Sequence, residues 1–193
     1  ILDIGAHVGL VSPPVGDMID PNGVVIAFEP AAINRRLLHR HISLNKVSSI
    51  IVVDAVVGED DREAVDFWEK ATDTGINSVV GRKGSRGFSR TSPRQIALDT
   101  YCEQKNLRPD VIKVDVEGAE IGVLKGGART IMRYMPFIYL SVHPEEILHL
   151  GGSTDQLLQL IRKFGYRCTN ANGREVINLE DKEYILCPER GRQ

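Results

Sequence analysis

Two closely spaced glycines and a carboxylate stand at the ends of the first two apolar runs of the chain. Residues 1–9 read ILDIGAHVG, so Gly5 and Gly9 follow a short apolar run. Glycines in such a turn let the backbone approach a ligand without an intervening Cβ. The next apolar run, residues 24–28, is followed by Glu29. Because a carboxylate there can accept hydrogen bonds from both hydroxyls of a ribose, the two segments predict a site for a nucleoside cofactor.

The spacing of the glycines distinguishes two kinds of nucleoside cofactor. The dinucleotide fingerprint G-x-G-x-x-G needs a second glycine where the pyrophosphate presses on the backbone. His7 stands at that position here, and Leu10 stands where the third glycine would fall. A cofactor without a diphosphate, such as S-adenosylmethionine, therefore fits better. A tight strand-to-helix turn of an unrelated α/β protein is the alternative explanation of the same residues.

A second group of chemically active residues is the charged string IKVDVEGAE at residues 112–120. Alternation places Lys113, Asp115 and Glu117 on one side of a predicted strand and apolar residues on the other. Ligands gather at the carboxyl ends of such strands in open α/β sheets. The same charges could instead form a structural ion network, and Glu117 and Glu120 would also favour the dipole of a following helix.

His143 is the residue that we predict as the general base. It follows an apolar run, residues 137–142, that should end at the same sheet edge as Asp115. An ordinary histidine pKa suits proton transfer near neutrality. Glu117 is the rival base, and a histidine hydrogen-bonded before Pro144 is the alternative without catalysis. Asp115, Glu117 and His143 could together hold a divalent cation, but no ligand spacing indicates one, and we predict no metal site.

The elements that must position these residues follow from the alternation of strand-like and helix-like segments. This alternation predicts an α/β fold with a parallel sheet covered on both faces. Apolar runs of strand length predict strands at 1–4, 24–29, 50–56, 111–116, 137–142, 167–170 and 184–187. Apolar residues at helical spacing predict helices at 33–45, 117–134 and 153–164. Ser153 or Thr154 can cap the last of these helices.

Two stretches interrupt the alternation. Pro13 and Pro14 stand where the first helix should already be running, so we expect this helix to begin late or to be irregular. Residues 59–97 form an insert, in which the pattern of residues 64–69 indicates an added strand and residues 81–87 are basic and glycine-rich. Because long loops at this level commonly cover a ligand, the insert is a candidate lid; a solvated surface loop is the alternative.

Length and composition limit the classes of function. The 193 residues, 42% hydrophobic and 26% charged, fit one globular domain over residues 1–193, and a net charge of -2 argues against nucleic acid as a partner. No apolar stretch approaches the roughly 20 residues that span a membrane. Three cysteines without a C-x-x-C pair suggest neither disulfides nor a thiolate metal site, so we expect a cytoplasmic setting. Ile1 is not a natural start, and we expect an N-terminal extension before it.

Six short segments form a characteristic order along the chain. They are DIGAHVG at 3–9, FEP at 28–30, DAVVG at 54–58, LDT at 98–100, IKVDVEGAE at 112–120 and VLKGG at 123–127. Taken together and in this order, they resemble the FkbM family of S-adenosylmethionine-dependent methyltransferases. His7 stands where the family usually has Asn. The resemblance implies a Rossmann-like class I methyltransferase domain whose last strand is antiparallel. It also implies methylation of hydroxyl groups on glycans or secondary metabolites.

The resemblance further implies roles for individual residues. The turn around the methionine part of the cofactor comprises Asp3, Gly5, Ala6, His7 and Gly9. Glu29, with Pro30 beside it, binds the ribose, and the adenine is flanked by Asp54 and Ala55. Asp115 closes the side of the methionine amino group.

Two other functions share some of these features. A nicotinamide-dependent oxidoreductase could use the same ribose carboxylate, and a non-catalytic module could keep the cofactor fold without turnover. For a methyltransferase we expect a small-molecule or glycan acceptor. The sequence does not indicate an oligomeric state.

Overall fold

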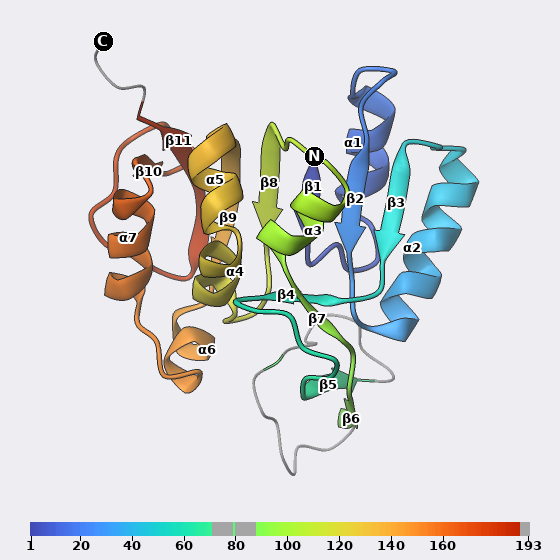
Figure 1. The fold of residues 1–193 in the computed structure, drawn as a ribbon, viewed down its shortest axis with the longest axis horizontal. Helices are drawn as coiled ribbons and strands as arrows, with labels where there is room; N and C mark the ends of the chain where they lie inside the picture. The colour runs from blue at the N-terminus through green and yellow to red at the C-terminus, as the bar shows by residue number, and fades with distance from the viewer. Residues whose placement is uncertain (71–78, 80–87, 190–193) are drawn as a thin grey trace.

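The core of the chain is a seven-stranded sheet (Figure 1) in the computed structural model, which describes residues 1–70, 79 and 88–189. Its strands, in spatial order, are β10 (Tyr166–Thr169), β11 (Lys182–Pro188), β9 (Phe137–Val142), β8 (Val111–Val114), β1 (Leu2–Ile4), β2 (Val25–Phe28) and β3 (Ile50–Val53). Neighbouring strands are parallel except at β11, which is antiparallel to both β10 and β9. The predicted mostly parallel sheet with an antiparallel last strand is therefore confirmed.

Helices cover both faces of this sheet. One face packs against α3 (Leu98–Gln104), α4 (Glu120–Gly126), α5 (Ala128–Tyr134) and α7 (Thr154–Lys163). The other packs against α1 (Ser12–Met18) and α2 (Ala32–Asn45). Because successive side chains of a strand point to opposite faces, Ile26 of β2 joins the first core and Ala27 joins the second. Figure 1 shows α7 beside β10 and α2 beside β3, at the two ends of the sheet.

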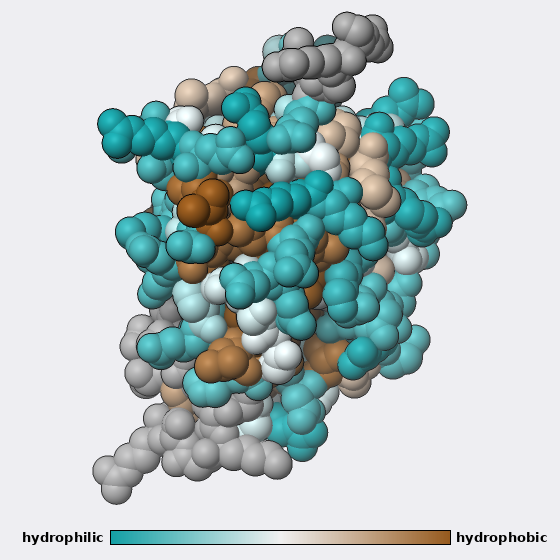
Figure 2. All heavy atoms as spheres, turned by 90° about the vertical axis from the view of Figure 1, so that its left-hand side faces the viewer, coloured by the Kyte–Doolittle hydropathy of each residue, from teal (hydrophilic) through white to brown (hydrophobic). Residues whose placement is uncertain are grey.

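The surface carries its apolar side chains in scattered positions. Figure 2 looks at the side of the molecule that bears α7 and β10, and it shows hydrophobic atoms in small patches among hydrophilic ones. Leu148 and Ile177 are among the exposed apolar residues, and single exposed apolar residues are normal for a folded domain. Within the described ranges, no helix combines the length and the apolar character needed to cross a membrane.

The predicted helix over residues 117–134 is in fact two helices, α4 and α5, which meet at Gly127. Asp99 of α3 explains the start of α5. Its carboxylate accepts hydrogen bonds from the backbone N–H groups of Arg129 (3.0 Å) and Thr130 (2.7 Å). Asp99 thus caps α5 from a different helix, and apolar periodicity carries no sign of such a cap.

Two predicted helix starts are confirmed. α1 begins late, at Ser12, and its first turn contains Pro13 and Pro14, where an absent N–H group breaks no helical hydrogen bond. α7 begins after Ser153, whose hydroxyl accepts a hydrogen bond from the N–H of Gln156 in a capping box.

Two predicted strands are too long. β3 ends at Val53, and the following β4 (Val56–Gly58) leaves the main sheet to pair with β7 (Gln95–Ala97). β8 ends at Val114, two residues before the predicted end, because Glu117 and Gly118 turn the chain with positive φ angles. Both breaks lie where the chain leaves the carboxyl edge of the sheet.

The insert over residues 59–97 contains the strand that the pattern predicts. β5 (Phe67–Lys70) pairs antiparallel with β6 (Phe88–Thr91). Figure 1 shows this hairpin below the carboxyl ends of β1 and β2. The basic, glycine-rich segment 81–87 lies outside the described residues, so the role of the insert as a lid stays a prediction.

Candidate functional site

A cavity of about 240 Å³ opens at the carboxyl edge of the sheet, where β1, β2, β3 and β8 end. Four of the chain segments that line it directly follow one of these strands each. These segments contribute Gly5, Ala6 and His7, then Glu29 and Pro30, then Ala55, Val56 and Val57, and finally Asp115, Val116, Glu117 and Ala119. The cavity therefore gathers eight of the twelve predicted site residues. Asp3, Gly9, Asp54 and His143 are not in its wall.

The turn after β1 has the backbone conformation that its glycines allow. Gly5 has a φ of +79°, and a Cβ at this position would lie 1.8 Å from the carbonyl oxygen of Asp115. Any side chain here would push β1 and β8 apart. His7 also has a positive φ, +53°. Asn, Asp and His adopt this conformation more readily than other non-glycine residues, so His7 can replace the usual Asn of the resembled family without changing the turn.

Glu29 is buried beside this turn and is held by protein donors. Its Oε1 accepts hydrogen bonds from the N–H of Ala31 (2.9 Å) and the side-chain amide of Asn34 (3.2 Å), and its Oε2 accepts one from the N–H of His7 (2.8 Å). Burial raises the pKa of Glu29 above its usual value, and these hydrogen bonds oppose the rise. A carboxylate oxygen has two acceptor sites. Among the described residues, one site on Oε2 is left for a ligand in the cavity.

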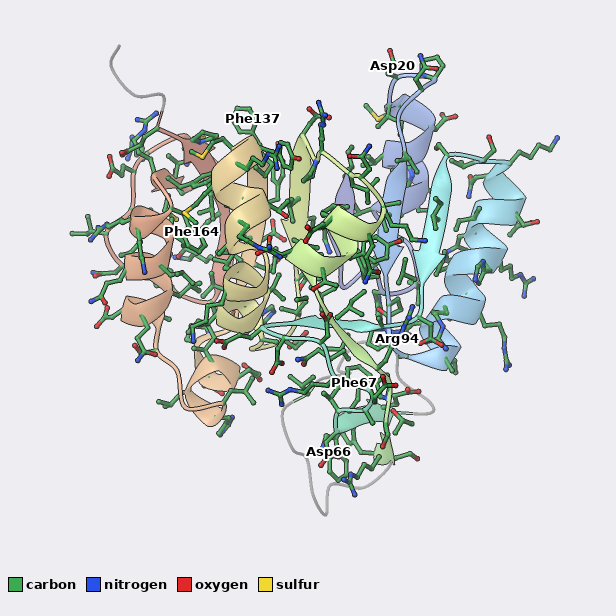
Figure 3. All side chains as sticks on the ribbon, in the orientation of Figure 1. Asp20, Asp66, Phe67, Arg94, Phe137 and Phe164 are labelled. Atoms are coloured by element: carbon green, nitrogen blue, oxygen red, sulfur yellow. The ribbon has the colours of Figure 1, made fainter. Side chains whose placement is uncertain are left out.

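Apolar side chains form the wall beyond Glu29. Ala55 and Val56 follow β3, and Phe67 of the insert closes the wall and is itself buried. Figure 3 shows Phe67 nearer the sheet than Asp66. Asp54 instead points outward, where its carboxylate forms an ion pair with Arg35 at 2.8 Å and is 59% exposed. Of the two residues predicted to flank the adenine, the structure brings only Ala55 to the cavity.

Asp3 and Gly9 lie outside the cavity wall, and the N–H of Gly9 closes the turn by donating a hydrogen bond to the carbonyl of Ala6 (2.9 Å). Asp3 is almost completely buried, accepts a hydrogen bond from the Ser12 hydroxyl (2.5 Å) and pairs with Lys113 (3.2 Å). The Lys113 ammonium also donates to the carbonyl of Gly5 (3.2 Å) and lies 3.5 Å from Asp115. Asp3 therefore acts on the cavity through Lys113, which links the ends of β1 and β8.

Four ionisable residues form a cluster beside the cavity. Asp115 and Glu117 belong to the cavity wall, and Glu120 and His143 lie outside it. The His143 Nδ1 lies 2.7 Å from Oε1 of Glu120. Its Nε2 lies 3.8 Å from a carboxylate oxygen of Asp115 and 3.9 Å from one of Glu117. The hydrogen bond with Glu120 raises the pKa of His143 to about 9, against the effect of burial. The sequence argument for His143 used an ordinary histidine pKa, so this part of the argument is wrong: at pH 7 the ring is an imidazolium.

Several residues of the site escaped sequence reasoning. Asn34 follows Glu29 by five residues and belongs to the first turn of α2, so helical spacing gave a weak signal for it. Phe67 comes from a distant segment, and no local pattern indicates that it lines the cavity. Glu120 belongs to the charged string but was interpreted only through the helix dipole. Among the residues that the structure describes, no group of three or more His, Cys, Asp and Glu side chains could hold a metal ion.

Comparison of the chain with known protein families identifies the family to which it belongs. The model of the methyltransferase FkbM domain family matches residues 3–168. The chain belongs to the FkbM methyltransferase family. The segments that carry the resemblance are thus parts of an FkbM domain, and four of them, at 3–9, 28–30, 54–58 and 112–120, contribute to the wall of the cavity.

Two relatives show how the FkbM domain compares with longer proteins. The AMB antimetabolite synthetase AmbE of Pseudomonas aeruginosa is 27% identical over 202 residues, which cover 86% of this chain and 9% of that protein. The crystal structure of methyltransferase FkbM from Methylobacillus flagellatus KT is 20% identical, with a TM-score of 0.60 over 96% of this chain and 42% of that one. The second likeness confirms the class I methyltransferase fold. The chain spans less than half the length of either relative.

Proposed function

We propose that this chain transfers the methyl group of S-adenosylmethionine to a hydroxyl group of a glycan or a secondary metabolite. The observation that carries the proposal is the position of Glu29, a buried carboxylate that faces the cavity beside the glycine turn. One acceptor site on its Oε2 is not used by any described residue and can accept a hydrogen bond from a ligand. Membership of the FkbM methyltransferase family supports the same reaction.

The residues of the cavity fit each part of the cofactor. Glu29 can accept a hydrogen bond from the ribose, and the apolar wall of Ala55, Val56 and Phe67 suits the adenine. At the other end, Asp115 supplies a negative charge for the methionine amino group. The turn has no glycine at position 7 to admit a diphosphate, which disfavours a dinucleotide. When bound, the cofactor supplies a methyl group that its sulfonium has already activated.

The chain must then orient the acceptor and accept its proton. Asp115 and Glu117 line the cavity. His143 lies outside the cavity wall, with its Nε2 within 3.9 Å of a carboxylate oxygen of each. Holding the acceptor oxygen in line with the methyl group can supply much of the rate enhancement. Glu117 and His143 are the two candidates to accept the proton. Glu117 lines the cavity, whereas His143 lies outside its wall and, as an imidazolium, would first have to lose its own proton.

Calorimetric titration with S-adenosylhomocysteine and with NAD tests the choice of cofactor. We expect saturable binding of S-adenosylhomocysteine and none of NAD. The opposite result would favour an oxidoreductase. Transfer of labelled methyl from S-adenosylmethionine to a panel of sugars and hydroxylated small molecules then tests the reaction. Binding without transfer to any member would support a non-catalytic module.

A further inference from the structure

Glu120 is a buried carboxylate that none of the steps above uses. Its exposed fraction is 0%. One oxygen, Oε1, accepts hydrogen bonds from the N–H of Gly118 (3.1 Å) and from Nδ1 of His143 (2.7 Å). The other, Oε2, has no hydrogen-bond partner among the described residues. Burial of a carboxylate is costly unless its contacts compensate, so the contacts of Glu120 need an explanation.

The contact with His143 fixes the direction of the imidazole. Because Nδ1 donates to Glu120, the other nitrogen, Nε2, points to the carboxylates of Asp115 and Glu117 at 3.8 and 3.9 Å. Both carboxylates belong to the cavity wall. His143 therefore links the buried carboxylate of Glu120 to Asp115 and Glu117, which a methyl acceptor in the cavity can contact.

The contact with Gly118 fixes the segment that carries Glu117. Glu117 has a φ of +50° and Gly118 a φ of +104°. A non-glycine residue with this backbone conformation is strained, so surrounding contacts must hold it there. A Cβ on Gly118 would lie 2.6 Å from Cβ of Glu146, so α6 (Pro144–His149) packs closely against this turn. Glu120 thus restrains Glu117 through the backbone as well as through His143.

We propose that Glu117 accepts the proton of the acceptor hydroxyl, and that Glu120 and His143 are positioning residues that hold this carboxylate at the cavity wall. The inference rests on the function proposed above. In the transfer step the acceptor oxygen forms a bond to the methyl carbon while the bond between that carbon and sulfur breaks. The electron pair of the broken bond stays on sulfur, and the acceptor proton passes to the Glu117 carboxylate, which becomes neutral.

The surrounding charges explain why Glu117 suits this role better than His143. Three carboxylates surround the imidazole: those of Asp115 and Glu117, which follow β8, and that of Glu120, which belongs to α4. With a pKa of about 9, both ring nitrogens of His143 carry a proton at pH 7, so neither can accept one. Burial raises the pKa of Glu117, with smaller increases from Asp115, Glu146 and Glu120, whereas His143 lowers it. The Lys113 ammonium lies 3.5 Å from a carboxylate oxygen of Asp115. Glu117 is thus a carboxylate of increased basicity that His143 helps to keep ionised.

Nuclear magnetic resonance titration of the 193-residue chain tests this coupling without an acceptor. Labelled histidine should show both ring nitrogens of His143 protonated at pH 7, and Glu120→Gln should lower the His143 pKa toward its usual value. His143→Gln should raise the pKa of Glu117 by about 1 unit, because an adjacent cation is lost. Glu146→Gln removes a neighbouring anion and should move the Glu117 pKa in the opposite direction.

A neutral His143 ring at pH 7 in the wild-type protein would overturn the inference, because that ring could itself act as the base. So would a Glu117 titration that does not move in His143→Gln. Thermal unfolding and binding of S-adenosylhomocysteine show that each variant is folded. If the wild-type protein does not bind S-adenosylhomocysteine, the proposed function fails, whichever way the carboxylates titrate.

Kinetics with an acceptor from the panel separate the roles. Glu117→Gln should lower turnover by about 10²–10⁴-fold at pH values where the wild-type Glu117 is ionised, the usual contribution of a general base. His143→Gln should keep measurable turnover at high pH, with the acidic limb of its pH profile moved upward as far as the Glu117 pKa moves. A loss in His143→Gln as large as that in Glu117→Gln at every pH would refute the proposal, because a positioning residue should leave the base active at high pH.

Discussion

Glu29 both holds the walls of the cavity together through hydrogen bonds and presents an acceptor to a ligand inside it. Three donors from the chain hold its carboxylate, two of them the backbone N–H groups of His7 and Ala31. The remaining acceptor site on Oε2 has a fixed direction because the carboxylate cannot rotate without breaking these contacts. Such preorganisation reduces the entropy that binding a ribose would cost.

Replacement of this carboxylate should therefore weaken cofactor binding. We expect Glu29→Ala to raise the Kd for S-adenosylhomocysteine by roughly 10- to 100-fold, since a hydrogen bond to a charged group contributes about 1.5–3 kcal/mol. Calorimetry measures the change, and Glu63→Ala removes an exposed carboxylate outside the cavity wall as a control.

An analogue of S-adenosylhomocysteine that lacks both ribose hydroxyls distinguishes direct contact from a damaged turn. This analogue should bind equally to the wild-type protein and to folded Glu29→Ala. If the variant weakens the binding of the analogue as much as that of the parent compound, Glu29 does not bind the ribose.

At the scale of elements, short segments from outside the main sheet complete the site. The β5–β6 hairpin supplies Phe67, whose side chain lies in the cavity wall with only 5% exposed. α3 supplies Asp99, which caps α5 and so ends the helix that the sequence pattern would have continued from α4. In both cases one side chain joins two elements that are distant in sequence.

Removal of Phe67 should open the wall beside the proposed adenine position. We expect Phe67→Ala to raise the Kd for S-adenosylhomocysteine by about tenfold, since loss of buried aromatic contact costs about 1.5–3 kcal/mol and part of this loss affects the free protein too. The matched control is Trp68→Ala, which removes the neighbouring aromatic side chain of the same strand. Trp68 is not in the cavity wall, so this variant should bind S-adenosylhomocysteine with wild-type affinity. Unchanged affinity in Phe67→Ala would place the adenine elsewhere.

Loss of the Asp99 cap should destabilise the whole domain, because α5 packs Ile131 into the main core. We expect Asp99→Ala to lower the free energy of unfolding by about 1–2 kcal/mol, the usual effect of removing a helix cap. Urea unfolding measures it. Glu103→Ala on the same helix removes only an exposed ion pair with Arg129 and should change stability by less than about 1 kcal/mol. Equal effects would show that the ion pairs, and not the cap, account for the loss.

At the scale of the molecule, the cluster around His143 links the carboxyl edge of the sheet to the stability of the fold. The side chains that meet there come from the end of β8, from α4 and from the residue after β9. A proton bound more tightly in the folded state than in the unfolded chain makes stability depend on pH.

The direction of this dependence follows from the raised pKa of His143. Its value of about 9 in the folded state exceeds its usual 6.5, so the contribution is complete below pH 6.5 and disappears as the pH rises through 9. Its full size is on the order of 3 kcal/mol. Urea unfolding between pH 6 and pH 10 should show a falling stability in the wild-type protein and a flatter curve in His143→Gln. Parallel curves would mean that His143 titrates alike in both states.

Local sequence was enough to predict the sheet, the turn after β1 and the carboxylate after β2. Each depends on a few adjacent residues: apolar runs specify strands, Gly5 permits the positive φ, and Glu29 directly follows its strand. The family could be predicted for the same reason, since its motifs lie at strand ends whose order along the chain is visible. The ends of the elements were less predictable, as the break at Gly127 shows.

Tertiary structure alone decided which polar groups meet and in what ionisation state. Asp54 follows β3 as predicted, yet Arg35 draws it away from the cavity. Asp3 belongs to the predicted turn, yet it points to Ser12 and Lys113. His143 and Glu120 are 23 residues apart, and their contact, together with the charges of Glu117 and Asp115, raises the His143 pKa to about 9. Electrostatic effects depend on distance and burial, which the order of residues does not contain.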